Sequence, residues 1–319
     1  MGSFERTSTA AAPPARLDGV GATMRAIGQD RYGPPDVLRP IEVDVPAPGD
    51  RDLLIRVHAA SIGAWVDHLV AGDPLVMRLQ LGLRRPRRRI RSSDVAGTVV
   101  AVGADVERFR VGDRVYGEAA AAFAEYAVAP AAACSSMPER LTYAQAAAVP
   151  IAGQTALLGL RDHGHLQPGQ HVLNIGAAGG VGSFAVQIAK ARAAEVTAVC
   201  SSEGVEFVRS LGADHVIDYA ERDILAGSVR YDVVFELGGV RSASALRSVL
   251  TTRGTLVLSS GDGGRWFGPL VRLGAAMVTS PFVRQRVCMF VANSKTANLA
   301  QLTGLIDRGE LHPIVDRTY

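Results

Sequence analysis

One short segment restricts the possible folds more than any other: residues 176–182 read GAAGGVG. The apolar run HVLNI (171–175) leads into it, and residues 183–194 follow with the periodicity of an amphipathic helix. Glycines allow a tight turn and let backbone approach a pyrophosphate, whose charge the free amides at a helix start attract. The flanking strand and helix are the context that such a motif requires. The segment therefore predicts a dinucleotide site, and the expected contacts are Gly176, Ala178, Gly179, Gly180, Val181 and Gly182.

The pattern along the chain predicts two domains. Residues 24–148 contain short β-rich runs separated by Gly and Pro, among them 53–60 and 94–103, which is typical of a barrel-like module. From residue 149 strands alternate with helices, which predicts a parallel, doubly wound α/β sheet. We expect the second domain at 149–292 and a return to the first domain at 293–319, where 296–308 predicts a helix and 312–319 a last strand. Residues 1–23 are small and polar and are expected to be a disordered extension.

Composition excludes several classes of protein. Hydrophobic residues make up 48% and charged residues 20%, so the chain can bury a core, and the net charge of +3 is too small to indicate nucleic acid as the main partner. Six arginines lie at 84–91, but such a run is usually a solvated loop. No apolar run reaches ~18 residues, so we predict no membrane span and no membrane partner. Three cysteines without a C-x-x-C pair argue against disulfides and a cysteine-built zinc site, and favour the cytoplasm.

The second strand of the α/β region favours NADPH over NADH. NAD-binding versions place Asp or Glu about 20 residues after the glycines, at the end of that strand, to hold the ribose 2′-OH. Here the strand ends at Ser201 and Ser202, whose hydroxyls would not repel a 2′-phosphate. Glu203 follows directly and no Lys or Arg lies between 195 and 208, so NADH stays the less favoured alternative.

Several longer motifs carry a resemblance to a known family. They are YGPPDVL (32–38), SDVAGTVVAVGADVERFRVGDRVYG (93–117), FAEYAVAP (123–130), AAAVPIAGQTAL (146–157), GAAGGVG (176–182) and LGADHVIDY (211–219). From about residue 24 to its end the chain resembles the zinc-independent, quinone reductase-like branch of the medium-chain dehydrogenase/reductase superfamily. The resemblance implies a GroES-like β domain, a Rossmann domain and an active site in the cleft between them. It also implies homodimers that pair Rossmann edge strands, for which 286–291 is the candidate.

The resemblance implies hydride transfer from NADPH to a quinone or to the activated C=C bond of an α,β-unsaturated carbonyl, without metal. Zinc members carry Gly-His-Glu where this chain has Ser92-Ser93-Asp94, and they carry a four-cysteine lobe that is missing here. Two alternatives stay open. One is a zinc-free alcohol or aldehyde oxidoreductase, and the other is a non-catalytic NADP(H)-binding scaffold or regulator.

The matching positions give individual site residues. Thr155 is expected against the cofactor, Tyr219 near the adenosine ribose and its 2′-phosphate, and Tyr32 in the substrate cleft. The ends of two further predicted strands, where backbone approaches the nicotinamide, add Leu237, Gly238, Ser259 and Ser260 to the cofactor site. Each of these positions also has a purely structural alternative.

The segment at 61–68 departs from the family pattern S-V-N-x-x-D-x-Y, because Gly63 replaces the Asn and Val66 the Asp. Asp67 is expected to replace that acid by a one-residue shift. His68 stands at the Tyr position and could donate a hydrogen bond or a proton near neutral pH. Trp65 could form an apolar wall for an aromatic substrate. The resemblance also implies a helix and strand beyond 319, so the last segment is expected to be truncated.

Overall fold

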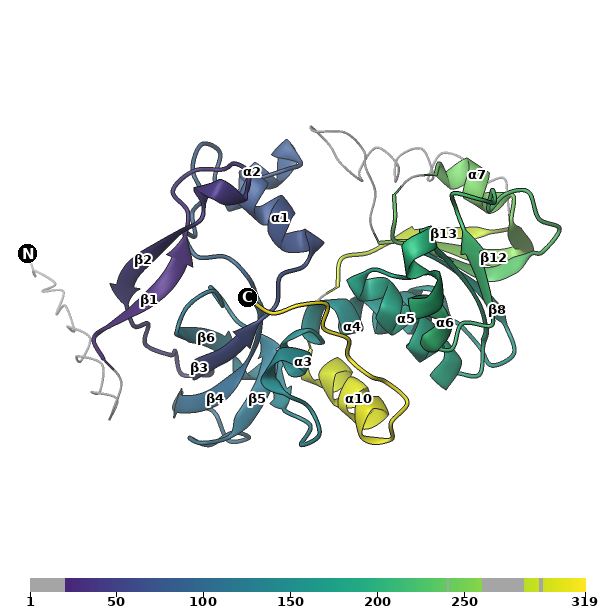
Figure 1. Cartoon of the computed structure of the whole chain (residues 1–319). Helices are drawn as coiled ribbons and strands as arrows, with labels where there is room; N and C mark the ends of the chain where they lie inside the picture. The colour runs from purple at the N-terminus through teal and green to yellow at the C-terminus, as the bar shows by residue number, and fades with distance from the viewer. Residues whose placement is uncertain (1–20, 240, 260–283, 293–294) are drawn as a thin grey trace, which may run out of the picture.

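The computed structural model describes residues 21–239, 241–259, 284–292 and 295–319. In this part of the chain two β regions lie side by side, with α4 (Pro150–Leu158) and α10 (Thr296–Asp307) between them (Figure 1). The region before residue 137 is antiparallel, and the region after residue 170 contains parallel strands. The predicted α/β class, with a GroES-like domain and a Rossmann domain, is confirmed.

The first domain is built on a five-stranded antiparallel sheet in the order β6-β3-β4-β5-β7. Its core is a cluster of alternating apolar residues that includes Leu53, Ile55, Val95, Val99 and Val115. Two further strands form a separate antiparallel pair, β1 with β2. The strands are β1 (Thr23–Gly28), β2 (Arg39–Asp44), β3 (Asp52–Ala60), β4 (Asp94–Val102), β5 (Arg114–Glu118), β6 (Tyr126–Pro130) and β7 (Cys134–Ser136).

Short helices connect these strands. They are η1 (Pro35–Val37), α1 (Ala64–Ala71), η2 (Leu75–Met77), α2 (Arg78–Leu81), η3 (Ala131–Ala133) and α3 (Tyr143–Ala147). The start of α3 is fixed by a capping box, in which Thr142 accepts from the amide of Gln145 and Gln145 accepts from the amide of Thr142. α1 packs Val66 and Val70 against Val37 of η1, so it belongs to the β domain.

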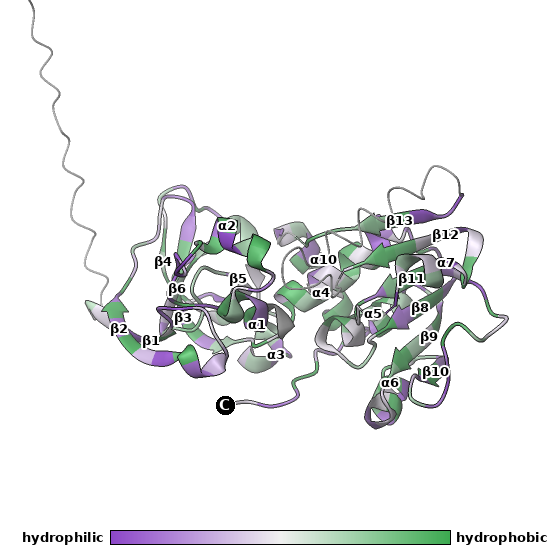
Figure 2. Cartoon of the chain, turned by 90° about the horizontal axis from the view of Figure 1, so that it is seen from above, coloured by the Kyte–Doolittle hydropathy of each residue, from purple (hydrophilic) through white to green (hydrophobic). Residues whose placement is uncertain are grey.

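The second domain has a six-stranded parallel sheet in the order β10-β9-β8-β11-β12-β13. By sequence rank this is 3-2-1-4-5-6, the order of dinucleotide-binding folds, and it reverses between β8 and β11. β9 and β12 are largely hydrophobic in Figure 2, as expected of strands that are covered on both faces. The strands are β8 (His171–Ile175), β9 (Glu195–Cys200), β10 (His215–Asp218), β11 (Tyr231–Glu236), β12 (Leu250–Leu258) and β13 (Arg286–Met289).

The helices of this domain are η4 (Gly159–His163), α5 (Gly180–Ala191), η5 (Ser202–Gly204), α6 (Val205–Ser210) and α7 (Ala243–Arg247). α5 is apolar on the side that packs on the sheet, where Phe184, Ala185 and Ile188 are buried. α4 packs against α5 and α10 packs against α4, so the helices between the sheets form one continuous core.

The predicted helix at 296–308 is confirmed as α10, and it is tied to the β domain. The hydroxyl of Tyr116, buried in β5, donates to the carbonyl of Leu299 at 3.0 Å and lies 2.9 Å from the Thr303 hydroxyl. At the start of α10 the Thr296 hydroxyl donates to the carbonyl of Ala132 at 2.8 Å.

The predicted strand at 312–319 is wrong. These residues form no strand, and the backbone N–H and C=O of His312 are bound by one side chain, Gln187 of α5, at 2.8 and 3.1 Å. Leu311 and Pro313 are buried, whereas Arg317 and Tyr319 are exposed. The alternating pattern in the sequence therefore reflects burial against α5 and not a place in a sheet.

Candidate cofactor and active site

The glycine turn joins β8 to α5 at the carboxyl end of the parallel sheet. Gly176 has a φ of +86°, which favours glycine, and the amides of Gly176 and Ala177 both donate to the carbonyl of Val199 in β9. A Cβ at Gly182 would lie 2.1 Å from the Gly176 carbonyl oxygen. The absence of side chains at these two positions therefore lets the first turn of α5 lie directly on the end of β8.

The start of α5 can receive an anion. The amides of Gly180, Val181 and Gly182 have no acceptor within the helix because they belong to its first turn. Ala178, Gly179 and Gly180 are exposed, a Cβ at Gly180 would meet nothing within 4 Å, and the first turn contains no acidic residue. Free amides, the helix dipole and open space together fit the diphosphate of a dinucleotide.

The residues predicted around the adenosine lie at the ends of the next two strands. Ser201 and Ser202 follow β9, and the amide of Tyr219, after β10, donates to the carbonyl of Cys200 at 3.1 Å. The side chain of Tyr219 is 62% exposed, so it is available to a ligand. Gly204 lies close to the glycine turn, since a Cβ there would be 2.8 Å from the Ala178 Cβ. The structure thus brings these predicted residues to the side of the turn next to β9.

The residues predicted around the nicotinamide lie on the opposite side of the turn, across the point where the strand order reverses. The Leu237 amide donates to the carbonyl of Ile175, and a Cβ at Gly176 would be 3.4 Å from the Gly238 nitrogen. The Ser259 amide donates to the carbonyl of Glu236 at 3.2 Å. Ser260 lies outside the described residues. Leu237, Gly238 and Ser259 therefore border the crevice where open α/β sheets bind their ligands.

Glu236 fixes the loop beside this crevice. It ends β11, is fully buried, and its Oε1 accepts the amides of Gly238 and Gly239 at 2.8 and 2.7 Å. Thr155 lies on α4, the helix packed against α5, and is 8% exposed. Glu236 and Thr155 are both buried beside the candidate cofactor site. Of the two, only Thr155 was expected from the sequence.

A buried carboxyl group marks the junction between the domains. Asp94, at the start of β4, accepts a hydrogen bond from the Ser61 hydroxyl at 2.9 Å and from the Ile151 amide in the first turn of α4 at 3.2 Å. Burial, together with the nearby charge of Glu118, raises the pKa of Asp94 to about 8, against the smaller opposite effect of its two donors. Asp94 thus holds a proton near neutral pH. Its partner Ile151 lies four residues before Thr155 on α4.

Sequence reasoning did not single out Asp94 as functional. The available signal was its position, because Ser92-Ser93-Asp94 matches the Gly-His-Glu segment of zinc members. The burial that raises the pKa of Asp94 depends on α4, which is more than 50 residues further along the chain.

The residues predicted to carry the chemistry are spread over the surface of the β domain. Asp67 and His68 are exposed on α1, and the side chain of Trp65 lies outside the described part of the structure. The hydroxyl of Tyr32 donates to the carbonyl of Gly82 at 2.8 Å, and the guanidinium of Arg78 lies 4.4 Å from the Tyr32 ring centre. Tyr32 therefore holds the α2 segment in the structure as it stands.

Comparison with known proteins agrees with this geometry. A family model described as alcohol dehydrogenase GroES-like domain matches residues 49–139, and one described as zinc-binding dehydrogenase matches 180–292. A chloroplastic quinone-oxidoreductase of Triphysaria versicolor is 32% identical over 94% of this chain and 92% of its own. The chain belongs to the quinone reductase-like branch of the medium-chain dehydrogenase/reductase superfamily. It is accordingly an NAD(P)H oxidoreductase of that branch.

Further relatives of this reductase-like chain include an NADPH-dependent alkenal/one oxidoreductase, chloroplastic, of Arabidopsis thaliana, 32% identical over 92% of this chain and 72% of its own. Among solved structures, the quinone oxidoreductase from Coxiella burnetii superposes with a TM-score of 0.81. It is 29% identical, and the match covers 92% of this chain and 91% of that one.

One matching family model is described as zinc-binding, but the described residues of this reductase-like chain offer no set of zinc ligands. Catalytic zinc needs about three converging N, S or O ligands. Among the described residues no group of three or more His, Cys, Asp or Glu side chains is placed to hold a metal. Cys134 is fully buried in the apolar core of the β domain, and this burial raises the pKa of its thiol to about 12. No step is therefore assigned to a metal.

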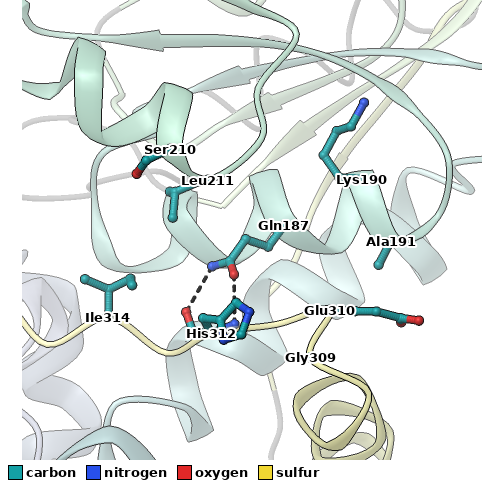
Figure 3. A pocket seen from close by; sticks show the side chains of 9 residues that line it. All are labelled: Gln187, Lys190, Ala191, Ser210, Leu211, Gly309, Glu310, His312 and Ile314. Atoms are coloured by element: carbon teal, nitrogen blue, oxygen red, sulfur yellow. Dashed lines mark hydrogen bonds between the residues drawn. The ribbon is translucent and has the colours of Figure 1, made fainter.

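Two cavities of this reductase-like chain lie away from the glycine turn. One, of about 490 Å³, is bordered by α5, the end of α6 and residues 309–314. Gln187, which is bound to the backbone of His312, is among the residues that line it (Figure 3). The other, of about 500 Å³, contains His171, Glu195 and His215, which begin three neighbouring strands. Both are remote from the carboxyl ends of the strands, where the candidate cofactor site lies. Among the described helices, none is long and apolar enough to cross a membrane.

Proposed function

We propose that this protein is an NADPH-dependent reductase that transfers hydride to a quinone or to the activated C=C bond of an α,β-unsaturated carbonyl without a metal. The observation that carries the proposal is the anion-binding turn at 176–182, which lies exposed at the reversal point of a parallel sheet. The names of the similar quinone and alkenal/one oxidoreductases support the substrate class.

The chain itself supplies binding and orientation. The amides of Gly180 and Val181 hold the diphosphate, and Ser201, Ser202 and Tyr219 receive the ribose and its 2′-phosphate. Leu237, Gly238, Ser259 and Thr155 border the nicotinamide and fix the face that it presents. The cofactor, when bound, supplies the hydride.

Reduction of an enone or quinone also requires a proton. His68, exposed on α1, is the candidate donor, with Asp67 one residue before it. Asp94 offers a second proton store, because its carboxyl is protonated near neutral pH and is joined to the Ser61 hydroxyl. We assign Asp94 a positioning role at Ser61 and α4, with Tyr32 and Trp65 as walls of the substrate cleft.

We also propose a homodimer formed through β13. This strand is the last in the sheet order, so one of its edges has no neighbour among the described strands. Location in the cytoplasm stays a prediction from the cysteine content.

Stopped-flow mixing of the protein and NADPH with a panel of quinones, enones, aldehydes and ketones tests the proposed reaction. We expect NADPH absorbance to fall with quinones or enones, at a rate that EDTA leaves unchanged. Oxidation of NADPH by aldehydes alone would instead indicate the carbonyl reductase alternative. Tight NADPH binding with no oxidation by any acceptor would indicate a scaffold.

A further inference from the structure

The segment after α1 is apolar yet only partly covered. η2 and α2 together read LVMRLQL, and none of these seven residues is buried. Leu79 is 63% exposed, and Leu83, two residues after α2, is 68% exposed. In α1, by contrast, Val66 and Val70 are buried in the domain, as an amphipathic helix requires. Exposed apolar side chains close together mark a surface that binds something.

The same segment is strongly basic. Residues 75–91 contain no Asp or Glu, and the side chains of Arg84, Arg85, Arg87, Arg88 and Arg89 are all exposed. Arg89 is paired with Asp30 at 2.8 Å. Within the described residues no ion pair involves Arg84, Arg85 or Arg88. Their charge is thus available to an anionic partner.

The loop is held in one shape. The Tyr32 hydroxyl donates to the Gly82 carbonyl, and Arg78 donates to the carbonyls of Gly72 and Ala71. The amide of Arg87 donates to the carbonyl of Leu81 at 2.8 Å. Gly82 has a φ of +113°, and a Cβ there would lie 2.1 Å from the Arg85 carbonyl oxygen. The backbone that carries Leu79, Leu83 and the arginines is therefore folded and held by several hydrogen bonds.

We propose that residues 75–89 form a docking surface for an anionic lipid bilayer, with Leu79 and Leu83 entering the interface and the arginines contacting lipid headgroups. This proposal replaces the expectation from the sequence that no membrane is a partner. Apolar side chains next to a basic cluster are the combination that binds such an interface. A nucleic acid would use the arginines but leave both leucines exposed. A second copy of the chain would cover the leucines but would bring two arginine clusters together in a symmetric contact. The inference does not depend on the proposed reaction.

Co-sedimentation of the full chain with vesicles tests this surface. We expect binding to vesicles of phosphatidylcholine mixed with phosphatidylserine, weak binding to phosphatidylcholine alone, and release at high salt because headgroup contacts are screened. The double variant R84E/R88E should bind anionic vesicles at least about tenfold more weakly. The matched control R230E/R253E, with the same charge change on exposed arginines of the other domain, should bind like the parent.

A second variant keeps the test independent of charge. L79S/L83S changes two exposed side chains, so it should fold with an unchanged melting temperature and lose several-fold in vesicle affinity. The absence of vesicle binding at low salt would overturn the proposal, as would equal binding by R84E/R88E and its control. Binding of duplex DNA or RNA without vesicle binding would overturn it in favour of nucleic acid. Loss of a dimer in L79S/L83S, again without vesicle binding, would overturn it in favour of self-association.

Discussion

The glycine turn and the Ser61–Asp94 junction are two parts of one proposed active site, built in opposite ways. The turn is made almost entirely of backbone, from the four residues between β8 and α5 and the first three residues of α5. The junction is made of side chains, and it joins a loop after β3, the start of β4 and the first turn of α4. Where backbone packs on backbone, as at Gly182, an added atom has no room. The properties of a site made of distant side chains depend instead on burial.

Because the two sites are built differently, they are sensitive to different kinds of substitution. At Gly182 the next heavy atom would lie 2.1 Å from an added Cβ, so a steric change there acts on the fold itself. At Asp94 the hydrogen bonds have ordinary lengths, and the carboxyl group is unusual because its burial away from water raises its pKa. Substitutions in the two regions should therefore differ in size and in the property that they change.

The largest effect is expected for Gly182→Val. The side chain cannot fit between α5 and the end of β8, so we expect a loss of roughly 4 kcal/mol or more in the free energy of unfolding, measured by urea denaturation. Gly180→Ala is the matched control, because its Cβ meets nothing within 4 Å, and it should change stability by less than about 1 kcal/mol. Equal stability of both variants would contradict the close approach described for Gly182.

A smaller and purely functional effect is expected for Gly180→Asp. The carboxylate would lie at the exposed start of α5, where it repels a diphosphate and occupies its space, so NADPH affinity should fall at least about tenfold. Fluorescence titration with NADPH measures the change, and the melting temperature without cofactor should stay near that of the parent. If NADPH binds Gly180→Asp as tightly as the parent, the diphosphate is held elsewhere.

The effect expected at the side-chain junction is of another kind, a change in pH dependence of at most about 1.4 kcal/mol for each pH unit. The pKa of Asp94 rises from 3.8 to about 8 on folding, so between these values the folded state holds a proton that the unfolded chain has lost. This group therefore stabilises the fold fully below about pH 4, and its contribution is lost as the pH rises toward 8.

Asp94→Asn mimics the protonated acid, so the variant does not lose stability through ionisation of this side chain as the pH rises. We expect the unfolding free energy of the variant to fall less steeply with pH than that of the parent, by up to about 1.4 kcal/mol per pH unit between pH 5 and 8. Denaturant titrations at several pH values measure both slopes, and Glu203→Gln, at an exposed carboxylate, should retain the parental slope. Parallel curves for Asp94→Asn and the parent would show that Asp94 is ionised in the folded protein.

Local signals explain what the sequence predicted well. The apolar run at 171–175 and the glycines at 176–182 act on neighbouring backbone, and the structure places both as expected. Asp94 was not predicted, because its protonation depends on contacts with residues far along the chain. The strand at 312–319 was wrongly predicted for a similar reason, since alternation in the sequence cannot distinguish burial against a helix from pairing in a sheet.

The two hydrogen bonds between the Gln187 side chain and the backbone of His312 connect α5 to the C-terminal segment. α5 begins at the proposed diphosphate site, and Gln187, two turns further along this helix, binds the C-terminal segment through its side-chain amide. Binding of NADPH at the start of α5 should reduce the motion of this helix. Residues 312–319 should then be cleaved more slowly by a carboxypeptidase when NADPH is present. The tail would then serve as a reporter of cofactor loading, readable by mass spectrometry without any substrate.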